Sequence, residues 1–289
     1  MPRARRRSRC SSVGHLHPRA TAAGVRLFAY EVVDSTNTEA FRRARAGERG
    51  PFWVTAHSQR AGRGRRGREW ISEPGNLYAS LLLDAPSLTH CAPQLSFVAS
   101  LAVRDAICDV AGLAAQVKLK WPNDILCGGL KLGGILIEGE LPFIVVGIGV
   151  NCAHHPDRTR YPSTDLSACG APVSPEEVFQ QLSARMCERL IQWNEGAGFA
   201  STRADWLQYA FRHGGNIRVS IGEGDVTGIF DTLDDTGRLV LRLPDGGQQA
   251  ITAGEVLPLE PAVPDISGDA AFACDGRKPP DVPPSRGAA

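Results

Sequence analysis

The segment that most restricts the fold is residues 61–70, AGRGRRGREW, which places Gly62, Gly64 and Gly67 in a G-x-G-x-x-G pattern. A dinucleotide-binding fold needs such glycines between a strand and a helix, so that the helix N-terminus meets a pyrophosphate. Here PFWVTAHSQ precedes the loop and NLYASLLLDA follows it, and both segments are typical of strands. A loop that joins strand to strand excludes the dinucleotide interpretation. A kinase-type loop is also unsupported, because no H-R-D or D-F-G motif follows.

Four arginines, Arg63, Arg65, Arg66 and Arg68, lie among these glycines. Guanidinium groups form paired, charge-assisted hydrogen bonds with anions, and glycine lets the backbone approach a ligand. The loop therefore suits a polyanion, with a solvated basic loop as the alternative. Trp70, directly after the loop, could cover an aromatic ligand or pack in the core.

Composition limits the remaining possibilities. The chain has 289 residues, 43% of them hydrophobic, and a formal net charge of +1, which fits one sizeable globular domain plus a small one and gives no global attraction to nucleic acid. Eight cysteines without a C-x-x-C pair argue for a reducing, cytoplasmic setting. Cys152, His154 and His155 are either a metal site or a solvated loop. No apolar run is long enough for a membrane helix, so we expect no membrane association.

The two ends of the chain differ from the rest. Residues 1–24 are basic and contain no acid, and they read as a transit peptide or, as we expect, a disordered tail. Residues 261–289 are rich in Pro, Gly and Asp, and we expect a second disordered tail there.

Between the tails the pattern alternates between strands and helices. The sequence predicts a strand from Val25 and then a helix with a capping box formed by Thr36 and Glu39. A buried helix over PQLSFVASLAVRDAICDVAGL and a hairpin turn at Gly128 and Gly129 follow.

A further helix starts at residues 174–177 with a cap, a first-turn proline and a reciprocal Glu, and another covers about STRADWLQYAF. Short strands with turns over residues 213–260 predict a small antiparallel barrel.

Lysine usage gives a second clue to a site. Arginine is used almost everywhere, and three of the few lysines fall in VKLKWPNDILCGGLKLGG: Lys118, Lys120 and Lys131. A compact ammonium there suggests a role beside a carboxylate or phosphate, with chance retention on surface strands as the alternative. Asp124 could orient an amine or a metal-bound phosphate, or simply cap a turn. In GIGVN, Gly147 and Gly149 leave bare backbone against which a planar polar group could lie, and Asn151 follows.

Five motifs, DSTNTEA, GRGRRGREW, KWPNDI, KLGGILIE and GIGVN, occur in this order, and together the chain resembles the biotin protein ligase family over about Val25 to Glu260. The resemblance implies an α+β fold: a mixed sheet flanked by helices, related to class II aminoacyl-tRNA synthetases, at 25–212, and a small C-terminal β-barrel at 213–260. It implies that biotin is activated with ATP and Mg²⁺ as biotinyl-5′-AMP and transferred to a lysine of a biotin carboxyl carrier protein domain.

The resemblance also assigns roles by position. The catalytic candidates are Arg63, Arg65, Lys131 and Asp124, with Arg63 facing the biotin carboxylate, Lys131 at the carboxylate and anhydride, and Asp124 orienting the acceptor lysine. The implied biotin-binding residues are Ser35, Thr36, Asn37, Gln59, Gly62, Arg63, Lys131, Gly134, Gly147 and Gly149. The implied nucleotide-binding residues are Arg65, Arg68, Trp70, Asn123, Asp124 and Asn151, and Asn151 is also the candidate Mg²⁺ ligand.

Other functions stay open at this stage. A lipoate ligase would share the scaffold, an octanoyltransferase would not need ATP, an inactive paralogue should have lost charged positions, and an RNA-binding module could use the arginine loop. Some family members carry an N-terminal DNA-binding domain, but too few residues precede the first strand here, so we expect no operator binding. Dimerisation is left open. We expect the arginine loop to be mobile when empty and ordered by ligand.

Overall fold

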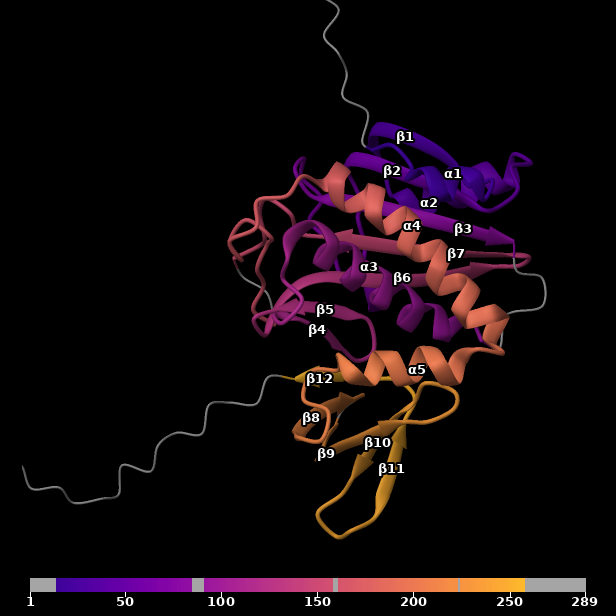
Figure 1. The fold of residues 1–289 in the computed structure, drawn as a ribbon. Coiled ribbons are helices and arrows are strands. Elements are labelled where there is room, and N and C mark those ends of the chain that lie inside the picture. Colours follow the sequence, from indigo (N-terminus) through magenta and orange to yellow (C-terminus); the bar gives the residue numbers. More distant parts are fainter. Residues whose placement is uncertain (1–13, 85–90, 158–160, 223, 258–289) are drawn as a thin grey trace, which may run out of the picture. The chain divides into compact units, whose positions relative to one another are not determined.

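The computed structural model describes residues 14–84, 91–157, 161–222 and 224–257. Its larger part is a seven-stranded sheet with strand order β1-β2-β3-β7-β6-β5-β4 (Figure 1). The strands are β1 (Arg26–Val33), β2 (Phe52–Gln59), β3 (Leu77–Asp84), β4 (Val117–Lys120), β5 (Asp124–Cys127), β6 (Leu130–Glu140) and β7 (Phe143–Val150). Only the β1–β2 pair is parallel, so the mixed sheet expected from the family resemblance is confirmed.

Helices cover both faces of this sheet. Helices α3 (Leu95–Ala111) and α4 (Pro175–Trp193) lie across one face, and α2 (Thr36–Arg45) packs on the other (Figure 1). Strand alternation explains the two layers: Trp53 of β2 belongs to the large core under α3 and α4, whereas its neighbours Phe52 and Val54 face α2.

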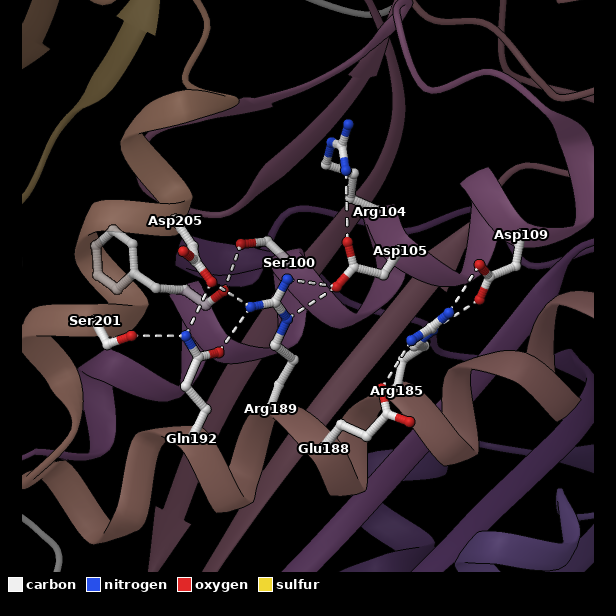
Figure 2. Close-up of polar contacts among 11 residues, drawn as sticks. Ser100, Arg104, Asp105, Asp109, Arg185, Glu188, Arg189, Gln192, Ser201 and Asp205 are labelled. Atoms are coloured by element: carbon white, nitrogen blue, oxygen red, sulfur yellow. Dashed lines mark hydrogen bonds and ion pairs between the residues drawn. The ribbon is translucent and has the colours of Figure 1, made fainter.

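Polar contacts tie the helices of the first layer together (Figure 2). Arg189 of α4 lies between Asp105 of α3 and Asp205 of α5 (Phe199–Gln208), with nitrogen–oxygen distances of 2.7 and 2.6 Å. One turn earlier, Arg185 of α4 donates to both carboxylate oxygens of Asp109 at 2.7 and 2.9 Å. The Arg185–Asp109 contact is bidentate and joins α3 to α4, while Arg189 links α4 to both α3 and α5.

The turn between β5 and β6 has the predicted form. Cys127 pairs with Leu130, which leaves Gly128 and Gly129 as a two-residue loop, and both have positive φ, 57° and 83°. Such a hairpin turn requires positive φ at both central positions, which glycine adopts without steric cost. The turn places Asp124 of β5 opposite Gly134 of β6.

Two predictions at the N-terminal side are wrong. The N-cap of α2 is Ser35, without a side-chain capping bond, and Glu39 instead accepts from Tyr30 while Thr36 bonds to Gln59. Residues 14–24, expected in a disordered tail, include α1 (Pro18–Ala22), whose Ala20 is fully buried and which packs against α4. The backbone N–H of His17 also donates to Ser183 of α4. The remainder of that expected tail, residues 1–13, lies outside the described residues.

The C-terminal part is a five-stranded antiparallel sheet with order β11-β10-β9-β8-β12. Its strands are β8 (Asn216–Ile221), β9 (Gly224–Leu233), β10 (Leu239–Arg242), β11 (Gln248–Ile251) and β12 (Glu255–Leu257). The antiparallel strands match the prediction, and the sheet is open, with β11 and β12 at its two edges. The expected tail at 261–289 lies outside the described residues. Among the residues that are described, no helix is long and apolar enough to span a membrane.

Candidate active site

A cleft of about 370 Å³ opens on the α2 side of the seven-stranded sheet. Its lining includes residues from the N-terminus of α2, from strands β2 to β7, from residues 61–70 (the arginine loop) and from the β4–β5 connection, and one residue of β12. All but one of the residues predicted for the site line it: Ser35, Thr36, Asn37, Gln59, Arg63, Arg65, Arg68, Trp70, Asn123, Asp124, Lys131, Gly134, Gly147, Gly149 and Asn151. The exception, Gly62, lies behind the lining, where a Cβ would be 2.4 Å from Ser72 Oγ.

One end of the cleft is a pocket of uncharged polar side chains, Thr36, Asn37, Gln59 and Ser80, which we call the neutral pocket. Gln59 Oε1 accepts from the backbone N–H of Thr36 at 2.8 Å and from its hydroxyl at 3.1 Å. The hydroxyl of Ser80 lies 2.7 Å from Thr36 Oγ1 and 2.6 Å from Asn37 Oδ1, so its single proton can serve only one of them at a time. Ser80 is fully buried behind the lining and contacts Thr36 and Asn37, so these two side chains and Gln59 are the polar groups that a ligand in the cleft can reach.

Three glycines, Gly134, Gly147 and Gly149, expose backbone along one wall of the cleft. We call this wall the glycine wall and the space beside it the slot. A Cβ on Gly147 would lie 2.4 Å from Asn37 Oδ1, and one on Gly149 would lie 2.7 Å from Cε2 of Trp70. Gly134 pairs with Gly149 across β6 and β7, and a Cβ on Gly134 would lie 3.5 Å from Cζ3 of the same indole. Trp70 thus covers the glycine wall, and its Nε1 donor is buried with no hydrogen-bond partner among the residues that the structure describes. A side chain at Gly147 or Gly149 would therefore collide with Asn37 or Trp70, whereas a Cβ at Gly134 would make only ordinary contact with the indole.

The arginine loop itself is a narrow hairpin. The backbone N–H of Gly64 donates to Arg68 O at 2.7 Å, and that of Trp70 donates to Gly62 O at 2.9 Å. At the tip, Arg66 adopts the left-handed region with φ 59°, and Gly67 follows with φ 70°. This conformation turns successive arginine side chains in different directions.

Three of the loop arginines have partners across the cleft. Arg63 forms a bidentate pair with Glu138 of β6, with Nε–Oε1 3.1 Å and Nη2–Oε2 2.8 Å. Arg65 donates to Asn123 Oδ1 at 3.2 Å, and Arg68 donates to Glu255 of β12 at 3.0 Å. Burial and then repulsion from Arg66 lower the pKa of Arg65, which nevertheless stays charged at neutral pH. Arg63 and Arg68 are thus paired with carboxylates, whereas the partner of Arg65 is an uncharged amide, so Arg65 is the loop arginine whose contact in the cleft leaves its charge uncompensated.

Asp124 lies between two lysines. Its Oδ1 is 2.5 Å from Lys131 Nζ and its Oδ2 is 3.0 Å from Lys120 Nζ. Burial alone would raise the pKa of Asp124, but the two ammonium groups hold it below its usual value. Lys120 is only 2% exposed, donates to the Val256 carbonyl of β12 at 3.1 Å, and has a pKa lowered by burial. Asp124 is thus an ionised, oriented carboxylate.

Asn151, Cys152 and His155, which directly follow β7, have different surroundings. Asn151 is buried, and its Nδ2 donates to Thr164 O at 2.9 Å. Cys152 is buried, which raises the pKa of its thiol to about 12, and His155 lies 2.6 Å from Asp165. In the described ranges, no group of three or more His, Cys, Asp or Glu side chains could hold a metal ion.

Sequence reasoning did not assign several residues to the site: Lys120, Tyr161 and Glu255, which line the cleft, and Ser80 and Glu138, which bond to lining residues. A signal existed for two of them. Ser80 is a polar residue in an otherwise apolar strand, and Glu138 shares the strand face of Gly134 and Leu136. Lys118, from the same lysine cluster as Lys120, does not line the cleft.

Comparisons with known proteins fit this geometry. Residues 29–151 match the biotin/lipoate A/B protein ligase family, and residues 213–257 match the biotin protein ligase C-terminal domain. The biotin--[acetyl-CoA-carboxylase] ligase of Paracoccus denitrificans is 42% identical over 234 residues, which cover 77% of this chain and 96% of that protein. The enzyme of the same name from Mycobacterium tuberculosis is 34% identical over 235 residues, 78% and 86% of the two chains.

A solved structure of the biotin protein ligase from Aquifex aeolicus in complex with biotin and ATP superimposes with a TM-score of 0.69 at 28% identity, covering 80% of this chain and 97% of that one. The chain belongs to the biotin protein ligase family.

Proposed function

We propose that this protein is an ATP-dependent biotin ligase that forms biotinyl-5′-AMP and transfers biotin to a lysine of a biotin carboxyl carrier protein domain. The observation that carries the proposal is the composition of one cleft, which joins a pocket of neutral hydrogen-bonding groups to a cluster of cations. Biotin has matching halves, a neutral ureido head and an anionic carboxylate. ATP adds further negative charge beside that carboxylate.

In the first half-reaction, a carboxylate oxygen of biotin attacks the α-phosphorus of ATP and pyrophosphate leaves. Two anions must approach each other, and the guanidinium groups of Arg63 and Arg65 and the ammonium of Lys131 neutralise that repulsion. Thr36, Asn37 and Gln59 hold the ureido head at the other end, so the carboxylate is presented to the cations. Trp70, over the glycine wall, shields the reactive anhydride from water.

In the second half-reaction, the amine of the carrier lysine attacks the acyl carbon and AMP leaves. Asp124 stays ionised at neutral pH because its pKa is lowered. A carboxylate with a low pKa is a weak base, so we assign Asp124 to attracting and orienting the acceptor ammonium group.

The expectation that Asn151 binds Mg²⁺ stays a prediction. No preformed cage of His, Cys, Asp or Glu side chains exists in the part of the chain that the structure describes, and Nδ2 of Asn151 is held by Thr164. Mg²⁺ that accompanies ATP takes many of its ligands from phosphates and water, which requires little of the protein.

The test is to incubate the purified protein with ATP, Mg²⁺ and either biotin or lipoate, and to look for the acyl-adenylate by mass spectrometry. We expect biotinyl-5′-AMP, and we expect Lys131→Ala to lower its formation by orders of magnitude without unfolding the protein. If lipoyl-AMP forms and biotinyl-5′-AMP does not, the substrate of the proposed reaction is lipoate rather than biotin. No adenylate with either acid, from folded protein, would refute it.

A further inference from the structure

Glu138 is a carboxylate bonded to two residues of the cleft lining, Arg63 and Asn37, and the proposed reaction gives it no role. It lies on β6, on the same strand face as the slot glycine Gly134, and its side chain is 29% exposed. An anion in a cleft that binds anionic ligands is unfavourable for those ligands unless a cation neutralises it. Arg63 does so with a bidentate contact.

The position of Arg63 is set by three hydrogen bonds to two residues, Glu138 of β6 and Thr38 of α2. Besides the two bonds to Glu138, its Nη1 donates to Thr38 Oγ1 of α2 at 2.9 Å. Glu138 in turn accepts from Nδ2 of Asn37 at 2.7 Å. Glu138 therefore joins the first arginine of the arginine loop to the neutral pocket.

The hydrogen bonds continue through the neutral pocket to the other end of the loop. From Asn37 they run through Ser80 and Thr36 to Gln59, whose Nε2 donates to Ser72 Oγ at 2.9 Å. Ser72 Oγ donates to the carbonyl of Trp70 at 2.7 Å. Both ends of the arginine loop are thus tied to one polar network, and Glu138 is its charged member.

We propose that Glu138 is a positioning residue that acts as an internal counter-anion: it holds Arg63, and with it the start of the arginine loop, until an anionic ligand replaces its carboxylate. The nature of that ligand rests on the proposed function, whereas the holding contact does not. Arg65, Arg66 and Arg68 repel one another next to Arg63, so a loop without this anchor opens more often.

The same chemistry predicts a dependence on salt. Both side chains of the pair are about one-third exposed, 33% for Arg63 and 29% for Glu138, so dissolved ions screen their attraction. An exposed or half-exposed pair is worth little in stability, and its loss changes the population of open loop by about two- to fivefold.

The experiment compares Glu138→Gln with Glu140→Gln by limited trypsin digestion, with cleavage after Arg63, Arg65, Arg66 and Arg68 followed by mass spectrometry. Glutamine at 138 keeps an acceptor for Asn37 and removes the charge. Glu140 is the matched control, because it lies two residues further along β6 and pairs with Arg45, outside the cleft. We expect about two- to fivefold faster loop cleavage in Glu138→Gln without ligand, and a weaker response to NaCl than in the control.

Saturating biotin and ATP should abolish the difference between the two variants, because the ligand then holds Arg63. Equal cleavage of both variants without ligand, or a difference that persists unchanged with ligand, would overturn the inference. If Glu138→Gln does not fold by circular dichroism, Arg63→Lys decides, since lysine keeps the charge but cannot form the bidentate pair and should also cleave faster at Arg65, Arg66 and Arg68. Failure of biotin and ATP to protect even the wild-type loop would count against the proposed function and leave the ligand-free comparison valid.

Discussion

Replacing Gly147 by alanine tests the glycine wall directly. The φ of Gly147 is not in the positive region, so the backbone accepts alanine, and only the space beyond the new methyl group matters. That methyl group would lie 2.4 Å from Oδ1 and 2.9 Å from Nδ2 of Asn37, which is far inside van der Waals contact. The buried amide must therefore move, away from Ser80 at 2.6 Å and Glu138 at 2.7 Å.

The size of the effect follows from those two bonds. A neutral hydrogen bond contributes about 1 kcal/mol and a bond to a charged group about 1.5–3 kcal/mol, while overpacking costs about 1–3 kcal/mol. Part of the strain is relieved as Asn37 turns into the cleft, so we expect biotin binding to weaken by about 2–3 kcal/mol, or roughly 30- to 150-fold.

The assay is biotin titration by calorimetry, with the melting temperature as a check on folding. Gly139→Ala is the matched control, because Gly139 lies on the neighbouring strand β6 and a Cβ there would meet nothing within 4 Å. If Gly147→Ala binds biotin as tightly as Gly139→Ala does, the slot does not receive the ligand where we place it.

Two further substitutions test the charges. Asp124→Asn leaves the buried Lys120 without its anion and should lower the free energy of unfolding at neutral pH by about 3 kcal/mol. Because the folded pKa of Asp124 is lowered, its stabilisation is present above the usual carboxyl pKa of about 4 and is lost as the pH falls further. Denaturation curves of Asp124→Asn and wild type should therefore converge in acid. A difference in the free energy of unfolding that stays constant with pH would contradict this. Arg189→Ala removes the guanidinium between Asp105 and Asp205, leaves Asp105 with only the longer Arg104 contact at 3.5 Å, and should lower the free energy of unfolding in urea by about 1–3 kcal/mol. Arg45→Ala removes the exposed pair with Glu140 and should leave the free energy of unfolding unchanged. Equal losses of stability in Arg189→Ala and Arg45→Ala would refute the distinction between a largely buried and an exposed ion pair.

The sequence predicted those parts of the site whose chemistry is contained in a short segment. Glycine and arginine spacing identified the arginine loop, and GIGVN identified the slot, because close backbone approach leaves a local signature. For Glu138 the sequence holds only the strand alternation with Gly134 and Leu136, which does not identify its partners, since Asn37 and Arg63 are 101 and 75 residues away in the chain. Only strand register brings the three together.

The errors have the same origin. Thr36 and Glu39 have the spacing of a capping box, but Gln59 and Tyr30 from two strands bind these side chains instead. Residues 14–24 look like an unstructured basic segment, yet Ala20 fits a buried position beside α4. In each case a tertiary contact outweighs the local preference.

The polar network also bears on the choice between biotin and lipoate. The ring of lipoate is a dithiolane without a donor or acceptor comparable to a ureido group, so Thr36, Asn37 and Gln59 would keep only their protein partners and gain no hydrogen bond from the ligand. A site built to hydrogen-bond a substrate rejects an analogue that lacks those groups far more strongly than an apolar pocket does. Since the same pocket is connected through Glu138 to Arg63, a ligand that fills only the cationic end leaves one side of the network unchanged. Biotin, with a polar group at each end, engages both, and this is the physical reason for preferring it.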